Sequence, residues 1–162
     1  MTEFTSFLMN QEDTLVEKIL RYAKKRNYTK YTSTLKEAWR LSVAGLSEAL
    51  IKAIEKNKDI PEMGTDDDYT RDEIAEFGIL EARKHRSRGI TLVMFLGLFK
   101  YYQQSYIDLV KESSFRPEQK EYYCQYIRRY FDHVELSFTM EWTGLTKDQE
   151  FEELQERKKQ PN

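Results

Sequence analysis

The sequence has little cysteine, proline, glycine or histidine. Its 162 residues include one cysteine, three prolines, six glycines and two histidines. The single cysteine, Cys124, cannot form an intrachain disulfide, so the composition suits a reducing cytosol. Prolines and glycines supply most tight turns, and so few of them leave little material for a turn-rich β protein. We therefore expect a helical protein.

A strong excess of one charge and a long apolar run are also lacking. The formal net charge is -2, which provides no overall attraction to nucleic acid or to an anionic membrane. The N-terminal stretch MTEFTSFLMN lacks the basic start and the apolar run of a secretory signal. The uncharged run from Ile90 to Phe99 is about half of the ~20 residues that cross a bilayer. We expect a cytoplasmic protein with neither nucleic acid nor membrane as a partner.

Apolar residues recur at helical spacing along most of the chain, and they predict about six helices with no convincing strand. The predicted fold class is all-α: a single-domain bundle of about six helices, for which a globin-like arrangement is an open alternative. Eight acidic residues between Asp59 and Glu76 indicate a solvated loop. The predicted helices begin at residues that cap helices or favour their first turn. These are Asn10 or Thr14, Thr34 with Glu37, Thr70 with Glu73, Thr91, Pro117, and Thr146 with Gln149.

The predicted second helix carries an apolar seam, in which spacings of four and three residues alternate. Such a seam packs along one partner helix, which lies either in the same chain or in a second copy of it. The predicted fifth helix offers an aromatic face as another surface for a homodimer. The seam consists of Trp39, Val43, Leu46, Leu50 and Ala53, and the aromatic face of Tyr123, Ile127, Tyr130, Val134 and Phe138.

The predicted helix near residues 91–112 is apolar on all sides in its first half, from Leu92 to Phe99. A helix of this kind belongs at the centre of a bundle, so we expect its large side chains to be buried. Gly97 lies in mid-helix at a cost of ~1 kcal/mol relative to Ala, and it indicates the close approach of another helix or of a ligand. Gly89 suits the left-handed position after the end of the preceding helix, expected at Arg88.

Few residues suit catalysis or metal binding. The two imidazoles are His85 and His133. Asp132 and His133 are adjacent on a helix and point about 100° apart, so they do not form a base with its orienting carboxylate. The scattered glycines form no phosphate-binding loop, and one cysteine with two histidines is a poor zinc set. We predict no catalytic residue, no metal site and no cofactor, with haem on one of the histidines as an alternative.

A basic run lies near the end of the predicted third helix. Its charges either favour a helix C-terminus and pair with the acidic loop, or bind an anion or the acidic face of a partner. The run consists of Arg83, Lys84, Arg86 and Arg88.

Seven of the eleven tyrosines form two clusters, within residues 101–106 and 122–130. Buried hydroxyls need hydrogen-bonding partners, so tyrosines that face inward would line a polar cavity for a small ligand. The alternative is that half-buried tyrosines cover the rim of an aromatic core. The candidate ligand-pocket residues are Gly97, Tyr101, Tyr102 and Tyr106.

Two stretches, RNYTKYTSTLKEAWRLSVAGLSEAL and EARKHRSRGITLVMFLGLFKYYQQSYIDLV, resemble the all-helical N-terminal sensory domains that precede PAS and kinase modules in bacterial and archaeal sensor histidine kinases. In the second stretch, small and basic residues, Arg and Gly precede an apolar helix with Tyr near its end. This pattern is also similar to the non-haem globin-like N-terminal domains of stressosome scaffold proteins. The resemblance covers roughly Leu15 to Leu145 and carries no catalytic motif.

The resemblance implies that residues 1–145 form a helical sensory domain and that residues 146–162 begin a helical connector to PAS or kinase modules downstream in the same polypeptide. The chain would be the cytosolic input module of a sensor histidine kinase, and it would not itself be an enzyme. A small ligand or a partner would favour one arrangement of the bundle and pass the signal through the C-terminal helix. The alternative is a helical dimerisation or protein-interaction module without a small-molecule ligand.

Overall fold

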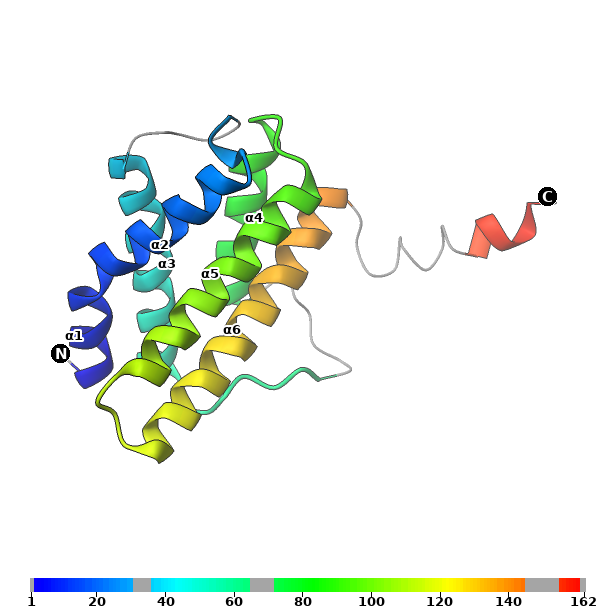
Figure 1. Ribbon diagram of the computed structural model, residues 1–162. Helices are drawn as coiled ribbons and strands as arrows, with labels where there is room; N and C mark the ends of the chain where they lie inside the picture. The colour runs from blue at the N-terminus through cyan, green and yellow to red at the C-terminus, as the bar shows by residue number, and fades with distance from the viewer. Residues whose placement is uncertain (1, 31–35, 65–71, 145–154, 161–162) are drawn as a thin grey trace.

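The computed structural model describes residues 2–30, 36–64, 72–144 and 155–160, and these residues form helices and no strand (Figure 1). The prediction of an all-α bundle of about six helices is therefore confirmed. Residues 155–159 are also helical. The elements of the bundle are α1 (Glu3–Asn10), α2 (Glu12–Lys25), the 3-10 turn η1 (Tyr28–Lys30), α3 (Lys36–Lys56), α4 (Glu73–Arg86), α5 (Leu92–Glu112) and α6 (Pro117–Thr143).

Several helix ends follow the local signals in the sequence. The side chain of Thr91 caps α5 by accepting a hydrogen bond from the Met94 N–H at 3.2 Å. Pro117 is the first residue of α6, where its missing N–H costs no hydrogen bond. Gly89 has a φ of 75° in the turn between α4 and α5, a left-handed conformation that favours glycine. These three predictions are confirmed, although α4 ends at Arg86 and not at Arg88.

Other helix starts differ from the prediction. Gln11 is at the N-cap position of α2 and makes no side-chain cap, so the prediction of a cap at Asn10 or Thr14 was wrong. Helix α4 begins after Asp72, whose side chain accepts a hydrogen bond from the Ala75 N–H at 2.6 Å. The remaining predicted caps, Thr34, Thr70 and Thr146, lie outside the described residues.

Helix α1 is not among the predicted helices. Thr2 caps it by accepting a hydrogen bond from the Thr5 N–H at 3.1 Å. Phe4 and Leu8 lie one turn apart and are buried. The ring of Phe4 stacks on Tyr123 of α6, with centroids 4.3 Å apart. This short helix therefore belongs to the core and covers the start of α6.

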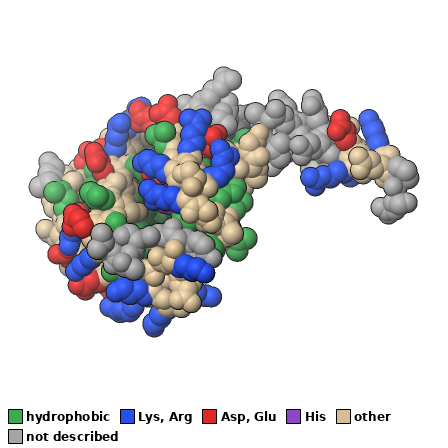
Figure 2. Space-filling view, turned by 90° about the horizontal axis from the view of Figure 1, so that it is seen from above, with side chains coloured by type: hydrophobic (Ala, Val, Ile, Leu, Met, Phe, Trp, Pro, Cys, Tyr) green, Lys and Arg blue, Asp and Glu red, His purple; other side chains and the backbone are tan. Residues whose placement is uncertain are grey.

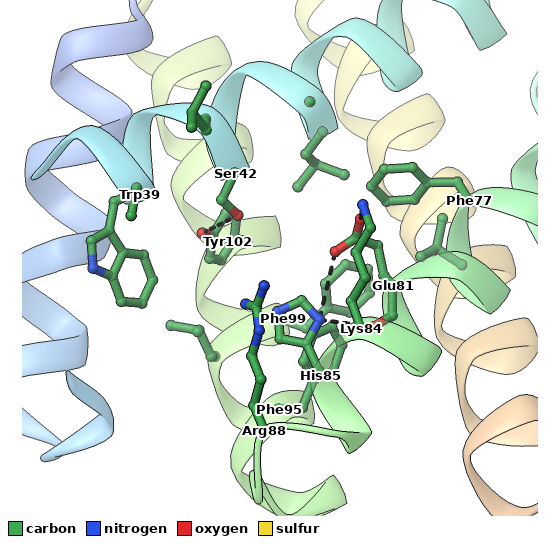
Figure 3. Close-up of a pocket in the computed structure, with 16 residues that line it drawn as sticks. Trp39, Ser42, Phe77, Glu81, Lys84, His85, Arg88, Phe95, Phe99 and Tyr102 are labelled. Carbon is green, nitrogen blue, oxygen red and sulfur yellow. Dashed lines mark hydrogen bonds and ion pairs between the residues drawn. The ribbon is translucent and has the colours of Figure 1, made fainter. Parts of the chain in front are cut away.

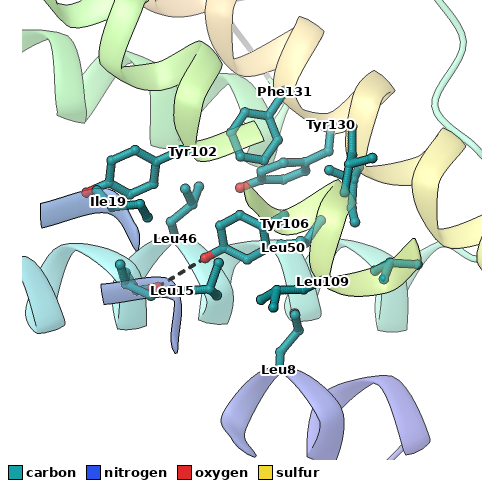
Figure 4. Packing of buried hydrophobic residues seen from close by; sticks show 14 of the residues in the cluster. Leu8, Leu15, Ile19, Leu46, Leu50, Tyr102, Tyr106, Leu109, Tyr130 and Phe131 are labelled. Atoms are coloured by element: carbon teal, nitrogen blue, oxygen red, sulfur yellow. Dashed lines mark hydrogen bonds between the residues drawn. The ribbon is translucent and has the colours of Figure 1, made fainter. Parts of the chain in front are cut away.

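The longer helices alternate in direction along the chain (Figure 1). Arg40 of α3 pairs with Glu12 at the start of α2, and Lys36 pairs with Glu17 further along it, so α2 and α3 are antiparallel. Helices α4 and α6 run in the same direction, with α5 in the opposite direction beside α6. Figure 4 shows the core between these helices, where leucines from α1, α2 and α3 surround Tyr106.

The apolar seam of α3 packs within the chain. Four of its five residues are buried, and Ala53 is partly buried. Helix α2 lies along α3, joined to it by the ion pairs of Arg40 and Lys36. Of the two partners left open by the sequence, the structure contains the one in the same chain, and this seam is not free to bind a second copy. The aromatic face of α6 is used in the same way, with Ile127, Tyr130, Val134 and Phe138 buried.

Helix α5 occupies the predicted position, but its second half is more buried than its apolar first half. The second half contains most of its buried residues, including Tyr102, Tyr106 and Val110. In the apolar first half, Phe99 is buried, and Val93 is 80% exposed. The expectation that this half is fully buried was wrong, because α2 covers the second half and a pocket adjoins the first. None of the described helices combines the length and apolar character needed to cross a bilayer.

Candidate functional site

A pocket of about 400 Å³ lies between the N-terminal half of α3, the C-terminal half of α4 and the first half of α5 (Figure 3). Small-molecule sites have volumes of roughly 300–1,000 Å³, so this pocket is of a suitable size. Its lining combines aromatic rings with a few polar groups. That composition is typical of sites for small organic ligands.

The pocket forms where α3 and α4 diverge. Lys56, the last residue of α3, pairs with Glu73, the first residue of α4, with 2.8 Å between Nζ and Oε1. The opposite ends of these two helices line the pocket. Gly45 of α3 widens the opening, because a Cβ atom built there would have no neighbour within 4 Å.

The α5 side of the pocket is an aromatic wall supported by α6. Phe95 stacks on Phe138, with centroids 3.7 Å apart and 7° between the ring planes. Phe99 packs on Phe131 at 4.7 Å. Phe138 in turn stacks on Trp142, near the end of α6, at 5.4 Å. Ring contacts therefore extend from the pocket to the C-terminal end of α6.

Two hydroxyl pairs join α3 to α5. At the pocket, the hydroxyl oxygens of Ser42 and Tyr102 lie 3.0 Å apart. Deeper in the core, the hydroxyl oxygens of Ser47 and Tyr106 lie 2.6 Å apart. Burial raises the pKa of Tyr102 above its ordinary value, so the hydroxyl is uncharged at neutral pH and can donate or accept. The pocket thus has one neutral polar group at its α3–α5 edge.

His85 and Glu81 form the polar α4 side. The His85 Nδ1 lies 2.7 Å from the main-chain carbonyl of Glu81. Since a carbonyl can only accept, Nδ1 carries a hydrogen and Nε2 is unprotonated in the neutral ring. Burial lowers the pKa of His85, opposed by the hydrogen bond and the charge of Glu81. The imidazole is therefore neutral at pH 7. Its ring also contacts the edge of Phe95, with centroids 4.8 Å apart.

Cationic side chains lie at the mouth of the pocket. Lys84 pairs with Glu81 at 3.3 Å. Arg88 lies in the turn after α4, where its N–H donates to the His85 carbonyl at 3.0 Å. Figure 3 shows the guanidinium of Arg88 directed toward the space between α4 and Trp39 of α3. Figure 2 shows several Lys and Arg side chains grouped beside apolar side chains at this end of the molecule.

The four residues predicted to form a ligand pocket do not come together around this one. Tyr102 lines it. Tyr101 instead stacks on Tyr22 of α2, with centroids 3.9 Å apart. Tyr106 is fully buried in the core and bonded to Ser47. A Cβ atom at Gly97 would lie 2.9 Å from the hydroxyl of Tyr28, so this glycine accommodates a neighbouring side chain of η1.

The tyrosines of α6 hold the segment that follows α3. Tyr126 donates to the carbonyl of Asn57 at 2.9 Å, and Tyr122 donates to that of Lys58 at 2.5 Å. The His133 Nε2 lies 3.1 Å from the carbonyl of Glu62. These contacts satisfy main-chain acceptors in a segment without regular structure. This second tyrosine cluster therefore has a structural role.

Two residues of the basic run, Arg83 and Arg86, bind the end of α6. Arg83 pairs with the carboxylate of Glu141 at 2.8 Å. Arg86 donates to the carbonyls of Glu141 and Trp142 at 2.9 and 3.0 Å. Arg86 thus satisfies two carbonyls in the last turn of α6, and Arg83 neutralises a carboxylate beside them. Of the two predicted roles, the structure shows that of favouring a helix C-terminus, because Arg83, Lys84 and Arg86 lie in the last turn of α4. Arg86 also binds the last turn of α6.

Within the described ranges, no group of three or more His, Cys, Asp or Glu residues is placed to hold a metal ion. Comparison of the chain with protein-family models, curated proteins and solved structures finds no match.

Most of the pocket residues could not be predicted from the sequence. Trp39 was assigned to the seam, Phe95 and Phe99 to a buried helix, and Gly45 was not singled out. A useful signal was the pair Ser42 and Gly45, two small residues about one helical turn apart beside the seam. This signal locates a weakly packed face of α3 but not the helix opposite.

Proposed function

We propose that this chain is a small-molecule-binding input domain, in which occupancy of the pocket changes the C-terminal end of α6. One observation carries the proposal: Phe95, a wall of the pocket, stacks on Phe138, which stacks on Trp142 at the end of α6. A ligand against Phe95 would alter the position of that ring, and the closely packed rings behind it would have to adjust.

Helix α4 supports a second connection between the same two places. Glu81 and His85 line the pocket, whereas Arg83 and Arg86 of the same helix bind the last turn of α6. A rotation or shift of α4 on ligand binding would therefore act on the end of α6. Full switching from 1:99 to 99:1 needs about 5.5 kcal/mol of differential affinity, and smaller differences give partial responses.

The output that fits this arrangement is a downstream module joined to α6, and we propose the sensor histidine kinase that the resemblance in the sequence implies. The C-terminal residues 146–162 would begin the connector, and 155–159 are helical. In this proposal the chain acts in the cytoplasm and has no catalytic activity of its own.

Binding can be tested with N-phenyl-1-naphthylamine, a neutral dye whose fluorescence rises in apolar surroundings. We expect saturable binding to the intact chain and its loss in Gly45→Phe, because residue 45 lines the pocket and has open space around its Cβ. Gly45→Ala, which adds one methyl group, is the matched control and should retain binding. Dye binding that is unchanged in Gly45→Phe would place the dye elsewhere and overturn the proposed pocket.

The connection to α6 can be tested by amide hydrogen exchange with and without the dye. We expect a change in protection at residues 139–144, with little change at the start of α6. In Phe138→Leu, which interrupts the ring contacts, dye binding should persist and the change at residues 139–144 should diminish. Binding without any change at the end of α6 in the unmodified chain would contradict the input function.

A further inference from the structure

The pocket has an excess positive charge at its mouth. The carboxylate of Glu81 is shared between Lys84, at 3.3 Å, and His85, at 3.6 Å. No acidic side chain within the described residues forms an ion pair with Arg88. Because Lys84 and Glu81 neutralise one another and the imidazole is uncharged, Arg88 leaves about one uncompensated positive charge beside the apolar pocket.

The inner part of the pocket offers few polar groups. Phe77, Phe95 and Phe99 contribute aromatic surface from α4 and α5. The hydroxyl of Tyr102 is engaged with Ser42. A ligand that fills this space would need an apolar body, since polar atoms there would lose hydrogen bonds to water without replacement.

The mouth of the pocket therefore favours a negatively charged group on the ligand, and the interior favours an apolar body. A guanidinium presents a planar fork of N–H donors that matches a carboxylate in two parallel hydrogen bonds. Aromatic rings on two sides favour a flat ring between them. We propose that the ligand of the pocket is an aromatic carboxylate, with its ring against Phe95 and Phe99 and its carboxylate on Arg88. This inference rests on the proposed function and specifies the ligand class.

The test compares 2-naphthoate with 2-naphthamide, which has the same ring and nearly the same shape but no charge. Calorimetric titration of the full chain should show about tenfold tighter binding of the carboxylate, as expected for one charge-assisted contact at a partly exposed site. In Arg88→Gln the two compounds should bind with similar affinity. Arg128→Gln removes the same charge from an exposed position of α6 and should leave the tenfold preference intact.

A third compound, octanoate, tests the aromatic part of the proposal. It carries the carboxylate on a flexible chain and should bind several-fold more weakly than 2-naphthoate. Equal binding of naphthoate and naphthamide, a preference that survives in Arg88→Gln, or octanoate as tight as naphthoate would each overturn this ligand class. If the neutral dye still binds and is still blocked by Gly45→Phe, such a result leaves the pocket and its input function standing.

Discussion

The two faces of α4 differ in how closely they approach their neighbours. One face carries Ala75, Gly78 and Ala82 and lies directly against α6. A Cβ atom at Gly78 would be 2.1 Å from the Ser137 hydroxyl oxygen and 2.7 Å from the Val134 carbonyl. The other face carries Phe77, Glu81 and His85 and borders the pocket. Helix α4 therefore packs closely against α6 on one face, the closed face, and borders the pocket on the other, the open face.

The difference shows how a small bundle can be closely packed on one side of a helix and still contain a pocket on the other. Small residues let two helices approach until their backbones touch, and such a contact tolerates little change. Larger side chains on the opposite face keep α3 at a distance, and the space between is filled only in part. In the proposed function, a ligand in that space would move α4 against α6, which is packed too closely to absorb the motion.

The largest effect is expected at the closed face. Gly78→Ala should lower the free energy of unfolding by about 2–3 kcal/mol, because the new methyl group overlaps the backbone of α6. Urea denaturation measures this loss. Adding Ser137→Ala should recover part of it by removing the nearest atom, although the Val134 carbonyl remains. A loss below ~0.5 kcal/mol would show that the two helices are not closely packed.

A smaller loss of stability is expected at the C-terminal end of α4, where Arg86 binds α6. Arg86→Gln removes a cation that binds two carbonyls in the last turn of α6. We expect a loss of about 1–1.5 kcal/mol in the free energy of unfolding and faster amide exchange at residues 139–144. Arg128→Gln provides the control, with the same change of charge away from that end. Unchanged exchange in Arg86→Gln would remove this part of the proposed connection to α6.

Across the pocket from the open face of α4, a substitution of the same kind in α3 should stabilise the protein. Gly45→Ala should raise the free energy of unfolding by about 0.5–1 kcal/mol, because alanine favours the helix and its methyl group meets no atom within 4 Å. Urea denaturation beside Gly78→Ala compares the same substitution at the two contacts. Destabilisation by Gly45→Ala would mean that α3 and the opposite helices leave no space there.

The smallest effect concerns pH. Burial at the open face holds the pKa of His85 below its ordinary value of 6.5. As the pH falls, the unfolded chain therefore takes up this proton before the folded protein does, and stability decreases. This decrease in stability begins near pH 6.5, the ordinary pKa of histidine, and ends below the lowered pKa of His85. In His85→Gln, denaturation between pH 7.5 and 5 should show a weaker dependence on pH. An identical dependence would indicate that His85 is more exposed than its surroundings suggest.

Local features of the sequence were sufficient to predict most of the helices but not the candidate site. Thr91, Pro117 and Gly89 act on their own or neighbouring residues, so their roles could be inferred without knowing the fold. Tyr101 and Tyr106 could not be assigned in this way, because their partners Tyr22 and Ser47 are far away in the sequence. The same spacing that suggested a shared pocket directs their side chains to different helices.

The burial of α5 illustrates the same limit. Its apolar first half predicts burial only if other helices cover every side of it. In the structure, α6 supports the rings of Phe95 and Phe99 on one side, and the pocket adjoins them on another. Hydrophobicity alone does not distinguish a core helix from a pocket wall, since both are built from the same apolar side chains.

The amino-acid sequence by itself determined the helical class, most of the helix positions and the several apolar faces, because capping, proline geometry and helical spacing act over a few residues. Only the tertiary structure decided that Gly78 meets Ser137, that Arg86 binds the end of α6, and that Trp39 and Arg88 border one space. Those relations join residues tens of positions apart, and they depend on how whole helices pack, which is set by the shapes of many side chains at once.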